Sequence, residues 1–306
     1  MKKIIIAKHG GGELANQLWN YASVYACGLE LGVTVKNPSF YEYHSFFRFL
    51  QRESVHTKLR AIFFRTPQRR SSILSKKVRV MYSIGLKITG VLRKKCTISS
   101  QNALNKPLYL PPTMSLPSIF STCESLYVEG WLTRNPAGLK KWRNEIVDAF
   151  KPTEKIGEKV EAFIASLGNA YTKIIGIHIR QSDYKDFKGG AYLIDQKRVR
   201  EIINEYMKKT GLESSKTAFI IASDGAVDKA AFDGLNIYVS KENAVTDLFI
   251  LSKTDAILGS DSSFGEFAAW YGDIPHIIFK KEAMDWDYYK DKTSFFENKY
   301  CTMLAY

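Results

Sequence analysis

Residues 174–184 read IIGIHIRQSDY and contain the pattern that decides the fold. The first six residues form a short run that is mostly apolar and β-branched, which is typical of a strand buried on both faces. Further runs of this kind lie at 218–222, 236–239, 256–258 and 276–279. Helical patterns lie between and before them, at 154–167, 196–209, 245–252 and 264–271. Alternating strands and helices predict a parallel sheet covered on both faces.

The N-terminal half predicts a second unit of the same kind. Residues 3–7, KIIIA, predict a strand, and a glycine loop and a helix follow, with Gly32 as a natural stop before strand-like residues 33–35. A further strand is expected at 126–131 and a helix at 142–150, with an irregular stretch before them. We therefore predict an α/β fold of two Rossmann-like domains, 1–152 and 153–306, facing across a cleft.

The composition is that of a globular protein. The 306 residues are 45% hydrophobic and 25% charged, which leaves room for two domains. No run of eighteen uncharged apolar residues occurs, so we expect neither a spanning helix nor a cleaved signal peptide. The cysteines show neither a CxxC pair nor zinc-site spacing, which favours separate buried side chains in a cytoplasmic protein: Cys27, Cys96, Cys123 and Cys301.

The positive charge of the chain is concentrated in one block. Residues 44–106 contain fifteen Lys or Arg and one acidic residue, while the whole chain has a net charge of +13. Apolar and aromatic residues are interleaved with these cations, which favours the surface of an anionic membrane as a partner. Nucleic acid would require similar charge, and a solvated, loosely helical insertion fits equally well.

The loop after the strand at 174–179 carries candidate binding residues. Arg180 stands where ligands bind in parallel sheets, at the carboxyl end of a strand, and a guanidinium can contact two phosphate oxygens at once. His178 lies on the same strand face as Arg180, and a buried structural histidine is an equally good interpretation. Asp183 could orient Arg180 or accept a proton.

Two further strand ends carry polar loops. The segment GSDSSFGE at 259–266 opens a helix, so Ser262, Ser263 and the backbone at Phe264 present donors where the helix dipole favours a phosphate. A serine at this position is also an ordinary N-cap. Asp224, at the end of the strand at 218–222, either accepts hydrogen bonds from a base or ribose or forms a turn.

Three separate segments resemble one enzyme family. HIRQSDY is similar to the HxRRxDY motif of fucosyltransferases, particularly the bacterial α-1,2-fucosyltransferases of glycosyltransferase family 11. HGGGELANQLWNYA at 9–22 resembles that family's GGLGNQLFQYA segment, and SDSSFGEFAAWYG at 260–272 resembles NSSFSWWAAYL. The motifs occur in the same order along the chain. The basic block at 44–106 has no counterpart in that family.

The resemblance implies a GT-B-like fold, with an acceptor-side domain at 1–152 and a GDP-sugar-binding domain at 153–306. It implies inverting transfer of L-fucose from GDP-β-L-fucose, without a metal or other cofactor, to a glycan hydroxyl such as the 2-OH of a β-galactoside in surface polysaccharide or lipopolysaccharide. The implied catalytic residues are Arg180, His178 and Asp183. The implied donor-binding residues are Arg180, Asn16, Gly12, Ser262, Ser263 and Phe264.

Two departures from the family pattern bear on the site. Gln181 stands where many members have a second arginine, which removes one cation from the donor pocket. Residues 13–15 read ELA where Leu-Gly is usual, which changes the glycine loop. For deprotonation of the acceptor, Asp183, Glu13 and Glu266 are all candidates.

Parts of the sequence also match three other functions. Gly10, Gly12 and Ala15 match a dinucleotide-binding fingerprint, but Lys36 and Asn37 occupy the place of its acidic residue. Asp285 and Asp287 could bind a divalent cation, yet they follow no predicted strand end, so we expect surface acids and no metal.

A nucleic-acid-binding protein without catalytic activity would use the basic block, which contains no recognised motif, so no nucleic acid is expected as a partner. We instead expect peripheral contact of the block with the inner face of the cytoplasmic membrane, near lipid-linked glycan acceptors. The sequence leaves open the acceptor sugar, the linkage, the GDP-sugar, the catalytic base and the oligomeric state.

Overall fold

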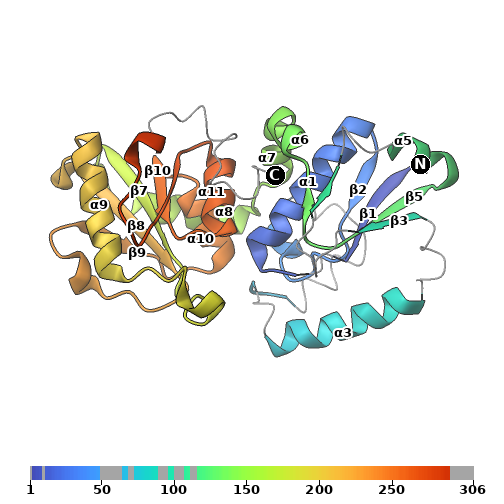
Figure 1. Cartoon of the computed structure of the whole chain (residues 1–306), viewed down its shortest axis with the longest axis horizontal. Helices are drawn as coiled ribbons and strands as arrows, with labels where there is room; N and C mark the ends of the chain where they lie inside the picture. The colour runs from blue at the N-terminus through green and yellow to red at the C-terminus, as the bar shows by residue number, and fades with distance from the viewer. Residues whose placement is uncertain are drawn as a thin grey trace. The chain divides into compact units, whose positions relative to one another are not determined.

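The computed structural model describes residues 2–8, 11–48, 64–67, 72–88, 96–99, 107–110 and 116–289. The chain divides into two compact units, one reaching to Glu154 and the other beginning at Lys155 (Figure 1). Each unit contains a parallel β-sheet with short buried strands.

The first unit is built on a four-stranded sheet in the order β2-β1-β5-β3. Its strands are β1 (Lys3–Lys8), β2 (Thr34–Lys36), β3 (Thr97–Ser99) and β5 (Ser125–Glu129). All pairings are parallel, and β1 lies between β2 and β5. A small parallel pair, β4 (Leu108–Tyr109) and β6 (Thr133–Arg134), accompanies the sheet.

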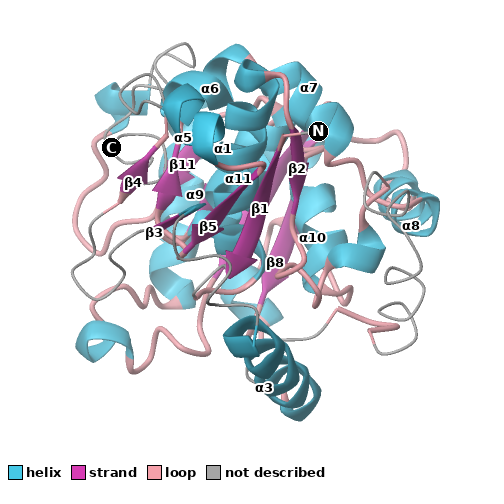
Figure 2. Cartoon of the chain, turned by 90° about the vertical axis from the view of Figure 1, so that its right-hand side faces the viewer, coloured by secondary structure: helices cyan, strands magenta, loops and turns pink. Residues whose placement is uncertain are grey.

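Helix α1 (Leu14–Leu31) lies beside β1 and contacts β1 and β2 (Figure 2). Most of its residues are buried. It ends where the sequence predicted, because Gly32 adopts φ 62° and its N–H bonds to the carbonyls of Gly28 and Leu29. The other helical elements of this unit are η1 (His44–Phe46), α3 (Ile73–Ile88), α5 (Leu116–Thr122), α6 (Pro136–Lys141) and α7 (Arg143–Ala149).

Two expectations for the first unit were wrong. Cys96 and Cys123 form a disulfide, so these two cysteines are not the separate side chains that their spacing suggested, and they do not support the cytoplasmic location that was inferred from them. Their Cα atoms are 6.2 Å apart although 27 positions separate them in the chain, because parallel strands β3 and β5 bring them together. The stretch expected to be irregular contains β4 and α5. Cys27 is a buried free thiol, as expected, and Cys301 lies outside the described residues.

The second unit contains a five-stranded parallel sheet in the order β11-β10-β7-β8-β9. Its strands are β7 (Lys173–Ile179), β8 (Thr217–Ser223), β9 (Asn236–Val239), β10 (Ala256–Gly259) and β11 (His276–Ile278). The chain adds β8 and β9 on one side of β7 and then crosses to add β10 and β11 on the other. This is the strand order of a Rossmann fold.

Helices cover both faces of this sheet. Helix α9 (Gln196–Thr210) packs its apolar stripe against the face formed by Ile175, Ile177 and Ile179. The alternate residues of β7 face the opposite side, where α10 (Ala244–Leu251) and α11 (Ser263–Gly272) contact each other. A Cβ at Gly176 would lie 2.9 Å from Leu251 Cδ2 and 3.0 Å from Thr254 Oγ1, so these side chains pack closely on β7 at the glycine.

The remaining elements of the second unit are α8 (Glu154–Ala165) and the short helices η5 (Phe187–Gly190), η6 (Ser214–Lys216), η7 (Lys229–Phe232) and η8 (Trp286–Tyr289). All five strands and all four longer helices predicted here are confirmed, to within two residues at most ends. Within the described part of the chain, no helix combines the length and hydropathy needed to cross a bilayer.

Candidate active site

The strand order of the second sheet places the candidate site. Strands β7 and β10 are neighbours, with His178 opposite Gly259, although β8 and β9 come between them in the chain. The order of the strands therefore reverses between β7 and β10, and open α/β sheets bind ligands outside the carboxyl ends of such strands. The loops that begin at Arg180 and Ser260 both start at this point.

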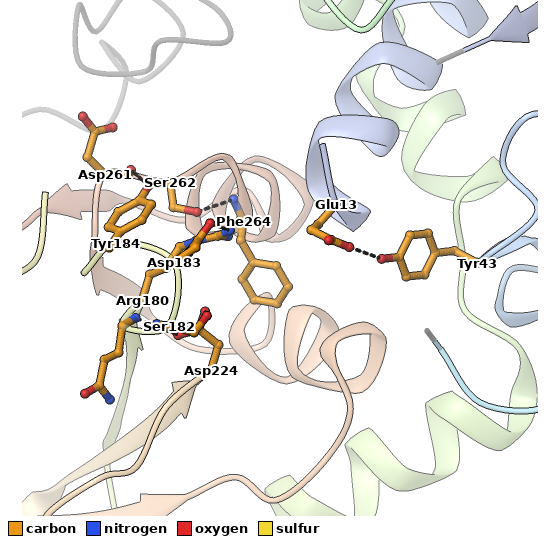
Figure 3. A network of polar contacts seen from close by, with 11 residues as sticks. Glu13, Tyr43, Arg180, Ser182, Asp183, Tyr184, Asp224, Asp261, Ser262 and Phe264 are labelled. Carbon is orange, nitrogen blue, oxygen red and sulfur yellow. Dashed lines mark hydrogen bonds and ion pairs between the residues drawn. The ribbon is translucent and has the colours of Figure 1, made fainter. Parts of the chain in front are cut away.

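Hydrogen bonds join these loops. The Arg180 N–H donates to Ser260 Oγ at 3.0 Å. The Tyr184 hydroxyl donates to the carbonyl of Asp261, so the last residue of the HIRQSDY segment is attached to the neighbouring loop (Figure 3). The residues of two separate sequence motifs are therefore held together at one edge of the sheet.

Arg180 is oriented by an acid and by an aromatic ring. Its Nε and Nη2 donate to the two carboxylate oxygens of Asp183 at 2.8 and 2.7 Å. Its guanidinium carbon lies 5.2 Å from the centre of the Tyr184 ring, a cation–π contact. No described residue accepts a hydrogen bond from Nη1, and 23% of the side chain is exposed. One edge of the planar guanidinium is thus fixed, and the other can donate to two oxygens of an anion such as a phosphate.

Asp183 is the partner that fixes this arginine. The hydrogen bonds from Arg180 lower the pKa of Asp183 below its ordinary value, and the carboxylate is therefore ionised at neutral pH. A carboxylate stabilised in this way is a weak proton acceptor. Of the two roles that the sequence left open, the geometry supports orientation of Arg180.

Asp224 organises the loop that follows β7. Its carboxylate accepts hydrogen bonds from the N–H of Gln181 at 2.7 Å, the N–H of Ser182 at 3.2 Å and the Ser182 hydroxyl. Burial opposes its ionisation, but these three bonds lower the pKa of Asp224 below its ordinary value. Of the two roles predicted for this residue, the turn-forming one accounts for the bonds observed here.

Gln181 crosslinks two strand ends instead of adding a cation. Its Nε2 donates to Ser223 Oγ and to the carbonyl of Ala226, both at 2.9 Å. A Cβ at Gly225 would lie 2.9 Å from Gln181 Cβ, so this close approach requires a glycine. The departure from the double-arginine pattern is therefore accommodated by a neutral network beside Arg180.

The N-terminus of α11 lies in the second loop. Ser262 is the N-cap, and its hydroxyl accepts the N–H of Phe264 at 3.3 Å. An α-helix leaves its first N–H groups without intrahelical partners, and its dipole places partial positive charge there. Arg180 and this helix end together form a positive site with backbone donors, which is suited to a diphosphate.

His178 is buried behind the loops. Only 7% of it is exposed, and its ring stacks on Phe264 with centroids 4.9 Å apart and planes at 29°. A Cβ at Gly265 would lie 2.8 Å from His276 Nε2 and 3.5 Å from His178 Nδ1, so α11 approaches both rings closely. Burial lowers the pKa of His276 to about 4, and burial with the nearby charge of Arg180 lowers that of His178 to about 3. Both imidazoles are therefore neutral at physiological pH.

The residues predicted in the N-terminal glycine loop belong to the first unit. Gly12 adopts φ 77°, and a Cβ there would lie 2.4 Å from Asn16 Cβ, so the two residues are in contact at the start of α1. Gln17 donates to the Gly12 carbonyl at 3.4 Å and to Glu42 at 3.3 Å. Tyr43 donates to Glu13 at 3.1 Å (Figure 3).

The other candidate acids differ in their exposure to solvent. Glu266 has no exposed surface, which separates its carboxylate from any acceptor hydroxyl. Asp285 and Asp287 are exposed, before and within η8. Of the basic block, only part lies within the described residues.

Sequence reasoning missed three residues that build the site. Tyr184 and Ser260 connect the two loops, and His276 packs beside His178 behind α11. Tyr184 and Ser260 could have been found from the expected adjacency of the two strand ends. His276 lies on an edge strand far along the chain, and no local pattern marks it.

Comparison with known proteins places the fold. No protein-family model matches the chain, and no curated protein matches it. The chain is similar to the crystal structure of POFUT1 in complex with GDP-fucose, with a TM-score of 0.55, 13% identity, and coverage of 91% of this chain and 98% of that chain. It is also similar to NodZ alpha-1,6-fucosyltransferase soaked with GDP-fucose, with a TM-score of 0.51, 14% identity, and coverage of 93% and 97%.

A third similar structure is a point variant of Arabidopsis thaliana FUT1 in complex with GDP. Its TM-score is 0.52 at 14% identity, and 92% of this chain covers 71% of that chain. The chain therefore has the α/β, GT-B-like fold of fucosyltransferase structures, as the sequence motifs implied.

Proposed function

We propose that the protein is an inverting glycosyltransferase that transfers L-fucose from GDP-β-L-fucose to a hydroxyl of a glycan acceptor. The fucose C1–O bond to the diphosphate breaks, a bond from C1 to the acceptor oxygen forms, and the acceptor loses its proton. The chemistry requires stabilisation of the negative charge that develops on the departing GDP.

One observation carries the proposal. The Arg180 guanidinium, oriented by Asp183, and the N-terminus of α11 lie on two loops that are bonded to each other at the reversal point of a Rossmann sheet. Both groups favour phosphate, and the fold is shared with structures that contain GDP-fucose or GDP. Arg180 with this helix end can supply charge stabilisation from the protein alone, so we propose that transfer needs no metal or other cofactor.

The remaining donor contacts follow the motif resemblance. We propose that Ser262, Ser263 and Phe264 line the nucleotide site and that Gly12 and Asn16 of the first unit contact the donor. His178 supports the site as a neutral ring behind Phe264. For the acceptor, we propose the 2-OH of a β-galactoside in a surface polysaccharide or lipopolysaccharide, since the three segments resemble α-1,2-fucosyltransferases.

A donor panel tests this proposal. GDP-fucose, GDP-mannose, UDP-sugars and NAD are compared by thermal shift and by nucleotide release, with and without a β-galactoside. We expect GDP-fucose to raise the melting temperature, since a ligand that binds only the folded state stabilises it, and to release GDP faster with acceptor. Stabilisation by NAD or by UDP-sugars alone would contradict the proposal, and preference for GDP-mannose would identify a transferase of another GDP-sugar.

Asp183→Asn separates orientation of Arg180 from proton transfer. If Asp183 orients the guanidinium, the amide keeps one acceptor oxygen, and we expect kcat/KM to fall about tenfold with the shape of its pH profile unchanged. If Asp183 is the base, kcat should fall ~10²–10⁴-fold and the acidic limb of the profile should disappear. Asp285→Asn, at an exposed position, is the matched control and should leave both quantities unchanged.

We also propose that the protein works at the inner face of the cytoplasmic membrane, where lipid-linked glycan acceptors are found. The basic block supports this location, because its cations are interleaved with apolar residues. Transfer to a water-soluble acceptor does not depend on it.

A further inference from the structure

Helix α3 of the first unit has two unlike sides. Tyr82 attaches one side to the body of the unit: its hydroxyl donates to the Ala7 carbonyl at 2.6 Å, and its ring lies 5.7 Å from that of Tyr41. Ser75, on the same side, is fully buried. Figures 1 and 2 show α3 at the margin of the first unit, apart from the sheet.

The other side of α3 is apolar and exposed. Ile73, Val80 and Ile84 lie within about 40° of one another around the helix axis and about 180° from Tyr82, since each residue turns the helix by ~100°. Their exposed fractions are 73%, 59% and 54%, and Met81 beside them is 73% exposed. Across the described part of the chain, the exposed large apolar side chains all lie on this helix. We call these four residues the α3 stripe.

Cations border the α3 stripe. Lys76 and Lys77 are exposed on the same side of the helix, and α3 also contains Arg79 and Lys87 but no acidic residue. The long alkyl chains of lysine can lie along an apolar surface while the ammonium groups contact anions. A helix with an apolar stripe edged by lysines is typical of one that lies in the headgroup region of a membrane.

We propose that α3 lies flat on a bilayer containing anionic lipids, with Ile73, Val80, Met81 and Ile84 inserted below the headgroups and Lys76 and Lys77 at the phosphates. The 16 residues of α3 extend about 24 Å, which suits a helix in the plane of the surface. This inference rests on the membrane location in the proposed function and identifies α3 as the surface that contacts the membrane. It does not depend on the donor chemistry.

Charge and chemistry favour a bilayer over other occupants. A second copy of the chain would bring the cations of two α3 helices together without any acid on either helix. Nucleic acid would pair with the lysines but would leave the α3 stripe in water. An anionic bilayer satisfies the cations and the apolar side chains together.

Vesicle co-sedimentation of the full chain tests the inference. We use vesicles of phosphatidylcholine alone and of phosphatidylcholine with phosphatidylglycerol, and expect binding at least about tenfold tighter to the anionic vesicles. Val80→Ser/Ile84→Ser should weaken that binding by about tenfold or more without changing net charge. Lys76→Glu/Lys77→Glu should weaken it similarly, whereas Lys208→Glu/Lys209→Glu, an exposed pair at the end of α9, is the matched control and should not.

Several results would overturn the inference. These are equal binding to neutral and anionic vesicles, no binding at all, or unchanged binding of the Val80→Ser/Ile84→Ser variant. A concentration-dependent dimer that this variant abolishes would assign the α3 stripe to a second copy of the chain. Tight RNA binding that depends on Lys76 and Lys77 but not on the α3 stripe would identify nucleic acid as the partner of α3. GDP release with a soluble β-galactoside should be the same in all four proteins, which distinguishes failure here from failure of the proposed function.

Discussion

Replacement of Arg180 by alanine is expected to lower kcat for fucosyl transfer about 10²–10³-fold, the loss typical of removing one preorganised group that stabilises developing negative charge. The backbone N–H of Arg180 bonds to Ser260 in the loop that leads into α11, and Asp183 fixes one edge of the Arg180 guanidinium, so the other edge stays available for the donor. Without it, the departing diphosphate retains only the backbone donors and the helix dipole. The measurement is single-turnover release of GDP from GDP-fucose with acceptor present.

The fold should tolerate this change. Arg180 makes its side-chain bonds to Asp183, a surface residue, and the backbone bond to Ser260 Oγ survives in the variant. We therefore expect a melting temperature within a few degrees of wild type. Arg200→Ala, which removes an arginine of α9 bonded to the Asp233 carbonyl, is the matched control and should transfer fucose normally. Transfer by Arg180→Ala within threefold of the control would exclude Arg180 from the donor site.

The sequence predicted the second unit almost completely, for physical reasons that are visible in its core. Strands such as β7 and β8 are buried on both faces and must be continuous apolar runs, so they are recognisable without knowledge of their neighbours. Polar loops such as those at Arg180 and Ser262 follow these runs directly. Their pairing could be expected once both strands were assigned to one parallel sheet.

Long-range contacts were beyond the reach of sequence patterns. The disulfide of Cys96 and Cys123 depends on the adjacency of β3 and β5, and β3 is only three residues long with no alternation to reveal it. His276 lies next to His178 only because β11 and β7 flank β10. The exposure of Ile84 on α3 likewise depends on which side of the helix Tyr82 attaches. Such facts come from the pairing of distant segments.

The buried pair of His178 and His276 predicts a strong dependence of stability on pH. A histidine in the unfolded chain titrates near its ordinary pKa of about 6.5, whereas the folded values are about 3 for His178 and about 4 for His276. Between pH 6.5 and about 4 the unfolded state therefore binds protons that the folded state does not. The contribution of the two neutral rings to the free energy of unfolding is therefore fully present above pH 6.5, and it is lost as the pH falls below that value.

The expected loss is large. At ~1.4 kcal/mol for each pH unit below 6.5, each histidine should lower the free energy of unfolding by about 2 kcal/mol between pH 7 and pH 5, and the pair by about 4 kcal/mol. The measurement is urea unfolding followed by circular dichroism at both pH values. His276→Gln removes one titrating group, so the difference between pH 7 and pH 5 should shrink by about 2 kcal/mol, even though the variant is less stable at each pH.

The same pair constrains the chemistry. Because the lowered pKa of His178 keeps its ring neutral at physiological pH, it is not an imidazolium that could act as a general acid, and the ring stacks on Phe264 at the start of α11. The rate of fucosyl transfer should therefore show no step near pH 6.5 that disappears in His178→Gln. A step of that kind, or an equal pH dependence of stability in wild type and His276→Gln, would mean that these rings are charged or accessible in the folded protein.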